Sequence, residues 1–230
     1  MTTSAMKRVP GAGWLALVGG GEFSFGETLL ADKGWIDKTP AGAIGFVPAA
    51  SDSSDYGRHF ADYLDEAFER EVETIPVYRD RDARRGKNAE RVAACAAVYL
   101  GGGVPDHLLE TLGGTPVADA LLEKLRSSGV VVAIAAAAQC AGAMARGIFA
   151  GTPLPGLGWL PEGVVETNFD PEHDRRLRKL LAVPGVTWGL GIPAGSAVLL
   201  GPGGVVETVG VSFVLEGAEG DLEPLGTPAS

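Results

Sequence analysis

The sequence has few of the residues that build disulfide-rich or metal-binding proteins. Its 230 residues include two cysteines, Cys95 and Cys140, and three histidines. Two cysteines are too few for a disulfide framework, and no Cys-x-x-Cys pair or His/Cys cluster has the spacing of a zinc site. We therefore expect a protein with no metal site and no cofactor.

Basic residues and long apolar runs are also scarce. The chain has 19 Lys and Arg against 29 Asp and Glu, which gives a net charge of −10. This balance argues against the basic surface that nucleic acids need and against attachment to an anionic membrane. No apolar run reaches the roughly 18 residues of a membrane span, and the N-terminus lacks the apolar core of a signal peptide. We expect a cytoplasmic protein whose partners include neither nucleic acid nor membrane.

The chain does contain short apolar runs that alternate with amphipathic stretches. Buried strands are predicted at 14–21, 43–51, 72–78, 96–103 and 130–138, and helices at 56–71 and 116–129. The run at 130–138 is apolar at every position, which is typical of a central parallel strand covered by helices on both faces. This βαβ rhythm predicts an α/β fold with a doubly wound, mostly parallel sheet flanked by helices.

After about residue 184 the pattern changes to short strands separated by glycines, without helices between them. Such spacing predicts antiparallel strands at the C-terminal end of the fold. We predict a disordered N-terminus at 1–12, a single α/β domain at 13–216 and a frayed polar tail at 217–230.

Three loops rich in small residues, at 19–23, 101–107 and 139–143, follow predicted strands. Ligands of open α/β sheets bind beyond the carboxyl ends of the strands, and glycine runs can point N–H groups at an anion or oxyanion. None of the loops matches a nucleotide-binding motif. Each loop by itself is explained by a turn, but three at one sheet edge predict a ligand site.

Cys140 is the candidate nucleophile in this pattern. In "AIAAAAQCAGAMA" (133–145) the apolar run breaks at Gln139-Cys140 among small residues, as in a nucleophile elbow. A thiol at a helix N-terminus is biased towards the thiolate. The alternative is that Cys140 is a small buried side chain, which is the interpretation we prefer for Cys95.

The order of several segments resembles the dipeptidase E and cyanophycinase family of serine peptidases over roughly residues 14 to 213. The segments are "LVGGGEF", "PAAS", "VYLGGGVPDHLLETL", "GVVVAIAAAAQCAGAMA" and "GLGWLPEGVVETNFD". The resemblance implies a class I glutamine amidotransferase-like, flavodoxin-like fold and cleavage of amide bonds through an acyl-enzyme. It further implies a small peptide or acidic amide substrate and pairing as a homodimer.

Laid on residues 138–143, the family elbow Gly-x-Ser-Ala-Gly-Ala places Cys140 at the serine position. The resemblance then implies an oxyanion hole formed by the N–H of Ala141 and an N–H from the glycine loop, at Gly102 or Gly103. Backbone donors in such a hole wait for the charge that develops on the tetrahedral intermediate.

Two further family motifs are altered in this chain. The family's Asp-Thr-His-Phe corresponds to residues 166–169, so Asn168 stands where the catalytic histidine is expected. Its Gly-Ile-Asp-Glu corresponds to residues 191–194, which read Gly-Ile-Pro-Ala. An asparagine does not accept a proton at neutral pH, so the usual serine–histidine pair is not encoded.

Other residues are candidates to replace the missing base. His107 directly follows the 101–103 glycine loop and is the best placed histidine, whereas His59 and His173 are expected on the surface. Glu22 follows the first strand and resembles the acid that contacts an elbow cysteine in PfpI-type proteins. The basic cluster nearest to the site is predicted to hold the substrate carboxylate or to be a solvated loop, and consists of Arg79, Arg81, Arg84 and Arg85.

Three functions remain open from the sequence. The first is an amide hydrolase with Cys140 as the nucleophile, since a thiolate needs less help from a base than a serine hydroxyl does. The second is a non-catalytic relative that keeps its pocket for ligand binding. The third is a redox-active or electrophile-handling protein in which Glu22 tunes Cys140.

Overall fold

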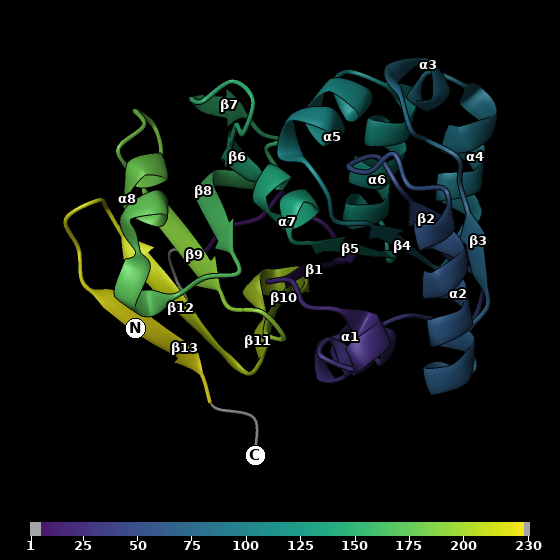
Figure 1. Ribbon diagram of the computed structural model, residues 1–230, viewed down its shortest axis with the longest axis horizontal. Helices are drawn as coiled ribbons and strands as arrows, with labels where there is room; N and C mark the ends of the chain where they lie inside the picture. Colours follow the sequence, from purple (N-terminus) through teal and green to yellow (C-terminus); the bar gives the residue numbers. More distant parts are fainter. Residues whose placement is uncertain (1–5, 228–230) are drawn as a thin grey trace.

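The computed structural model describes residues 6–227, which form two β-sheets with helices packed against them (Figure 1). The first sheet has seven strands, in the spatial order β11 (Val206–Val209), β10 (Ala197–Leu200), β1 (Trp14–Val18), β5 (Val130–Ile134), β4 (Ala97–Leu100), β2 (Ile44–Val47) and β3 (Val72–Thr74). The second has six strands, in the order β13 (Leu222–Gly226), β12 (Val211–Glu216), β9 (Trp188–Ile192), β8 (Leu160–Thr167), β6 (Gly142–Arg146) and β7 (Pro153–Pro155).

Helices cover both faces of the first sheet. They are α1 (Leu29–Ile36), α2 (Asp55–Phe68), α3 (Asp80–Ala83), α4 (Gly86–Ala94), α5 (Pro105–Leu112), α6 (Pro116–Arg126) and α7 (Ala136–Cys140), while α8 (Arg175–Leu181) packs on the second sheet (Figure 1). Alternate residues of β1 enter two separate cores, with Leu15 and Leu17 on the side of α5 and α6 and Ala16 and Val18 on the side of α1 and α2. Each face of the sheet is therefore buried, as its apolar strands predict.

The pairing confirms the predicted fold class. Strands β1, β5, β4, β2 and β3 are parallel, whereas β10 pairs antiparallel with β1 and β11 pairs antiparallel with β10. The second sheet was not predicted as a separate sheet. Its core strands β6, β8 and β9 are parallel, and β12 and β13 extend it antiparallel. Strand β8 mixes polar and apolar residues, so its pairing rather than a local pattern defines it.

Two predicted boundaries need correction. Residues 6–12 are not disordered, because Met6 is buried in the core and the N–H of Val9 donates to the carbonyl of Trp159. The segment 217–227 is not a frayed tail, since it contributes β13, which pairs with β12. Residues 1–5 and 228–230 lie outside the described residues. Among the described residues, no helix combines the length and apolar character needed to cross a membrane.

A buried carboxylate ties α1 to α2. Asp32 is fully buried, and its side chain accepts hydrogen bonds from Thr28 Oγ1 at 2.7 Å, Trp35 Nε1 at 2.8 Å and Tyr63 Oη at 2.8 Å. Because Tyr63 comes from α2, the carboxylate connects two helices on the same face of the sheet. Burial raises the pKa of Asp32, and the three donors offset part of the penalty for desolvating its carboxylate.

We expect Asp32→Asn to lower the free energy of unfolding by about 1–3 kcal/mol, because an amide NH₂ would face a donor instead of accepting from it. Urea unfolding measures this change. Asp37→Asn is the matched control, since Asp37 is exposed and makes only a surface ion pair with Lys33 at 2.8 Å, worth about 1 kcal/mol or less. Equal losses in the two variants would contradict a structural role for the Asp32 network.

Candidate functional site

Strands from both sheets end at one cleft. The carbonyl of Gly19, after β1, accepts the N–H of Asn168, after β8, at 2.7 Å. The carbonyl of Gly20 accepts the N–H of Gly195, after β9, at 2.9 Å. We call the cavity beside this junction the elbow cleft, a space of about 440 Å³ lined by the glycine loops after β1 and β4 together with Glu22, Glu27, Tyr56, Ile134, Ala135, Asn168 and Ala194.

The strand-to-helix elbow is at Ala135. This residue lies between β5 and α7 with φ 51° and ψ −115°, a conformation that L-residues rarely adopt. Its N–H donates to the carbonyl of Val18 at 2.9 Å, so β1 holds the turn in place. A sharp, strained turn from a strand into a helix is the backbone form of a nucleophile elbow, in which the turn residue faces the site.

The prediction that Cys140 stands at the elbow is wrong. Cys140 is the last residue of α7, is fully buried and does not line the elbow cleft. Its Sγ lies 3.6 Å from the carbonyl oxygen of Pro105. Burial raises the pKa of the thiol far above its ordinary value, and the negative charge of Asp106 raises it further. Cys95 is also buried, as expected.

The backbone fixes a different register for the family motif. When Gly-x-Ser-Ala-Gly-Ala is laid on residues 133–138, the serine position falls on Ala135, where φ is positive. The oxyanion donor after the nucleophile then becomes the N–H of Ala136, the first residue of α7, which no intrahelical bond uses. Ala141 does not contribute, since it is buried and its N–H donates to the carbonyl of Ala138.

Asn168 and Ala194 lie in the elbow cleft, as does Ala135. Asn168 is exposed and has φ 47°. Its side chain passes so close to Gly20 that a Cβ at that glycine would be 2.5 Å from the amide oxygen. The cleft therefore brings together the positions where the family motifs have serine, histidine and glutamate, and this chain has alanine, asparagine and alanine there.

The glycine loop after β4 also reaches the elbow cleft, as predicted for Gly102 and Gly103. A Cβ at Gly102 would be 3.5 Å from Cβ of Ala135, so the loop runs directly beside the elbow. The N–H of Gly102 donates to Tyr56 Oη at 3.3 Å. Burial raises the pKa of Tyr56 to about 12, so the phenol stays protonated at neutral pH.

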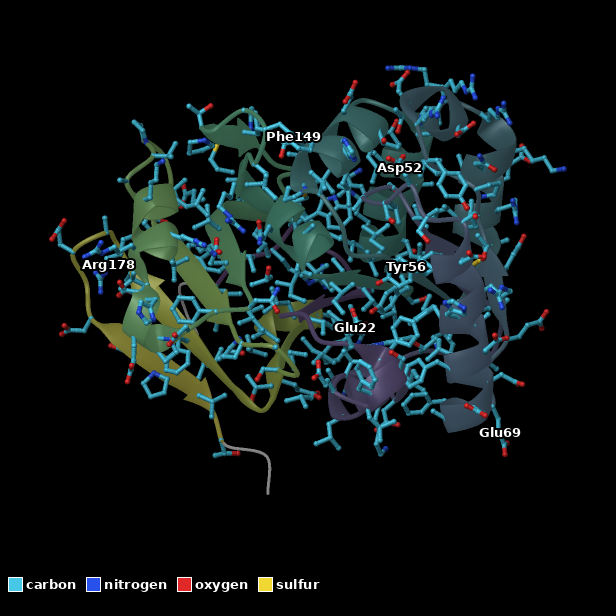
Figure 2. The ribbon with its side chains drawn as sticks, viewed as in Figure 1. Glu22, Asp52, Tyr56, Glu69, Phe149 and Arg178 are labelled. Atoms are coloured by element: carbon cyan, nitrogen blue, oxygen red, sulfur yellow. The ribbon has the colours of Figure 1, made fainter. Side chains whose placement is uncertain are left out.

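The charges around the elbow cleft are negative. Glu22 and Glu27 line it, and the N–H of Glu22 donates to Glu27 Oε2 at 2.8 Å. Figure 2 shows Glu22 and Tyr56 near the centre of the view, beside α1 and α2. Both residues also line an adjoining cavity of about 770 Å³, the side pocket, whose further titratable residues are Asp55, His59, Asp62, Tyr63 and Glu66. No lysine or arginine lines either cavity within residues 6–227.

The other candidate residues lie elsewhere. His107, on α5, lines a separate cavity of about 350 Å³ with Arg79 and Arg81, so it does not face the elbow. His173 is exposed and contacts Asp170 at 2.7 Å. Glu22 lies in the cleft, but Cys140 does not, and the contact predicted between them is absent from the described structure. Within residues 6–227, no group of three or more His, Cys, Asp and Glu is placed to hold a metal ion.

The sequence patterns did not single out Ala135, Tyr56 and Glu27, although they did place Ala194 where the family has glutamate. An alanine at the serine position offers no functional group to recognise. The family hexapeptide can also be laid on "AIAAAA" (133–138), where it matches two alanines, but it matches three residues of "AQCAGA" (138–143). The presence of a cysteine at position 140 therefore led to an elbow predicted five residues C-terminal to its position at Ala135.

Two solved structures have a similar fold. One is a peptidase from an acI-B1 Actinobacterium, with a TM-score of 0.73 and 22% identity, where the match covers 98% of this chain and 96% of the other. The other is a putative peptidase E protein from Listeria monocytogenes EGD-e, with a TM-score of 0.64, 15% identity and coverage of 86% and 98%. No curated protein matches the chain significantly.

The sequence model of peptidase family S51 matches residues 15–206. This match spans β1 to β11 and includes the elbow, Asn168 and Ala194. It agrees with the order of motifs around the cleft and with the fold of the two peptidase structures. The chain belongs to peptidase family S51, a family of peptidase-type hydrolases.

Proposed function

We propose that this protein is a family S51 member that binds a small peptide or amide in the elbow cleft without cleaving it through an acyl-enzyme. The observation that carries the proposal is Ala135 at the strained elbow. A methyl group has no lone pair with which to attack a carbonyl carbon. The elbow backbone is kept, while the atom that forms the covalent intermediate is missing.

The neighbours of Ala135 support the same interpretation. The amide of Asn168 does not take up a proton at neutral pH, and Ala194 has no group to orient a base. The polar groups that line the cleft are the amide of Asn168, the hydroxyl of Tyr56, the backbone of the glycine loops and the carboxylates of Glu22 and Glu27. Such groups bind a carbonyl or amide of a ligand and do not require a reaction.

Cysteine chemistry is a weaker alternative. A reactive thiol needs access and a lowered pKa, whereas Cys140 is fully buried and burial raises its pKa. Helix α7 has five residues, and Cys140 is at its C-terminal end. The helix dipole there disfavours the thiolate. A nucleophilic or redox role for Cys140 in the folded protein therefore has no support from its surroundings.

The charge of the cavities favours a ligand that carries an amine. Glu22 and Glu27 line the elbow cleft, and three more carboxylates line the side pocket. Of these carboxylates, Asp55 is paired with Arg58 at 3.4 Å. The remaining charge is negative, so an acidic ligand would be repelled and an ammonium group attracted. Arg79 and Arg81, from the basic cluster expected to hold a substrate carboxylate, line the separate cavity that contains His107. We therefore propose a neutral or amine-bearing ligand in preference to an acidic one.

We expect the protein to show no hydrolysis of aspartyl or lysyl dipeptides, because loss of a nucleophile and base costs about 10⁶-fold in rate. Release of free amino acid, followed by chromatography, measures this. Cys140→Ser should leave the result unchanged, whereas the triple variant with Ala135→Ser, Asn168→His and Ala194→Glu should gain hydrolysis. Turnover by the unaltered protein that a heat-unfolded sample lacks would overturn the proposal.

The thiol of Cys140 should resist iodoacetamide in the folded protein at neutral pH and react only after denaturation, because it is buried and protonated. Mass spectrometry of the labelled peptides measures both rates. Ser24→Cys provides an exposed thiol in the same chain for comparison. If Cys140 were labelled as fast as the introduced cysteine, Cys140 would be accessible, and a nucleophilic or redox role for it would be supported.

Binding should follow the charge of the cleft, with Lys-Ala bound more tightly than Ala-Ala and Asp-Ala weakest, as calorimetric titration measures. Ala194→Phe places a ring in the cleft and should weaken Lys-Ala binding about tenfold or more. Ala41→Phe is the matched control, since Ala41 is exposed in a loop before β2, at the opposite edge of the sheet. Binding of Asp-Ala as tight as that of Lys-Ala would contradict the proposed ligand charge.

A further inference from the structure

A further cavity, separate from the three described above, gathers basic side chains on a protein that is acidic overall. It has a volume of about 170 Å³ and lies between the end of β6, the loop that leads to β7, and α8. Arg146, Arg176 and Lys179 line it together with Gly151, Thr152 and Pro153. We call it the basic pocket. The net charge of the whole chain is −10, so three cations around one small cavity need a local explanation.

These cations are poorly neutralised by the protein. Their acidic neighbour is Glu166 on β8, whose Oε1 is 3.8 Å from Arg146 and 4.0 Å from Arg176. Elsewhere in the chain Arg91 contacts Glu73 at 2.6 Å and Arg178 contacts Asp174 at 2.8 Å. Charge-assisted hydrogen bonds have lengths of about 2.7–2.9 Å. The two contacts with Glu166 are therefore ion pairs without a close hydrogen bond.

An unsatisfied donor lies in the same place. Nε of Arg146 is buried and has no hydrogen-bond partner among the described residues, and neither has Oε2 of Glu166. Leaving a buried polar atom unpaired costs about 1–3 kcal/mol. Nε is out of reach of the pocket, but the Arg146 side chain is 35% exposed, so the rest of its guanidinium can donate to a ligand oxygen.

The loop between β6 and β7, which forms one wall of the basic pocket, is hydrogen-bonded to helix α5. The carboxylate of Asp106 on α5 accepts the N–H groups of Ile148, Phe149 and Ala150 at 2.7, 3.2 and 3.2 Å. Figure 2 shows Phe149 at the upper edge of the molecule, next to the β6–β7 region labelled in Figure 1. With its amides bonded to Asp106, the loop holds the pocket open without a ligand, so binding does not have to order it.

We propose that the basic pocket binds a phosphate group, either as free phosphate or as a phosphate monoester. Three cations against one carboxylate leave a local charge of about +2, which matches a phosphate dianion. Arginine suits this ligand because its planar guanidinium presents two parallel donors to phosphate oxygens. Arg176 and Lys179 are exposed on α8, so the pocket is open to ligands from solution.

Calorimetric titration of the full chain with inorganic phosphate, at slightly alkaline pH and ionic strength fixed with sodium chloride, tests the proposal. We expect saturable binding that Arg176→Gln and Lys179→Gln each weaken about tenfold, as the loss of one charge-assisted contact predicts. Arg175→Gln is the matched control, because Arg175 is exposed one residue before Arg176 and does not line the pocket. This control should bind phosphate as the unaltered protein does.

Three results would overturn the proposal: no saturable signal up to about 10 mM phosphate, equal binding by Arg176→Gln and the unaltered protein, or acetate binding as tightly as phosphate. Titration with phenyl phosphate distinguishes free phosphate from a phosphate monoester as the ligand. If its binding shows the same sensitivity to Arg176→Gln, the pocket accepts monoesters, and if it does not bind, the ligand is free phosphate. None of these outcomes depends on whether the elbow cleft binds or cleaves peptides.

Discussion

The junction between the two sheets depends on the glycines that follow β1. Gly19 and Gly20 accept hydrogen bonds from the segments after β8 and β9, and Gly19 also donates its N–H to Ser196 at 2.9 Å. A Cβ at Gly19 would lie 2.1 Å from the carbonyl oxygen of Pro193, and one at Gly20 would meet Asn168. The backbones approach so closely that only glycine fits. Because the strands of both sheets end here, the elbow cleft exists only while this contact is made.

The elbow at Ala135 has the strained backbone of a nucleophile elbow but carries a methyl group in place of a nucleophile. Positive φ at a residue such as Ala135 costs of order 1–3 kcal/mol and persists only where the surrounding structure enforces it. Here β1 holds the N–H of Ala135 and α7 begins directly after it. In a peptidase this strain presents the nucleophile, whereas in this chain it presents a methyl group to a cleft lined with carboxylates. The elbow backbone is therefore present without a nucleophilic side chain, which is the observation behind the proposal that the cleft binds a ligand.

Much of the fold and part of the site could be predicted from the sequence. Buried strands such as β5 are apolar on both faces, and α6 carries its own punctuation, with Pro116 at the start and basic residues in its last turn. Both signals depend only on residues close together in the sequence, so they can be recognised without the tertiary structure. Asn168, Gly102 and Gly103, which the sequence singled out, all line the elbow cleft, and their neighbours in the family motifs have distinctive side chains. Cys140 was misplaced because a run of alanines carries no signal that fixes the register of an elbow.

The sequence by itself determined the α/β class, the strands of the first sheet and the absence of histidine at position 168. Only the tertiary structure decided that Ala135 is the elbow, that Cys140 is buried, and that Glu22 and Glu27 rather than the arginines line the cleft. The physical reason is the distance along the sequence over which each kind of interaction acts. Periodicity and propensity act over a few residues, whereas a positive φ at one alanine is imposed by β1, more than a hundred residues earlier in the chain. The charges of Arg146, Arg176 and Glu166 likewise meet only because β6, β8 and α8 pack together.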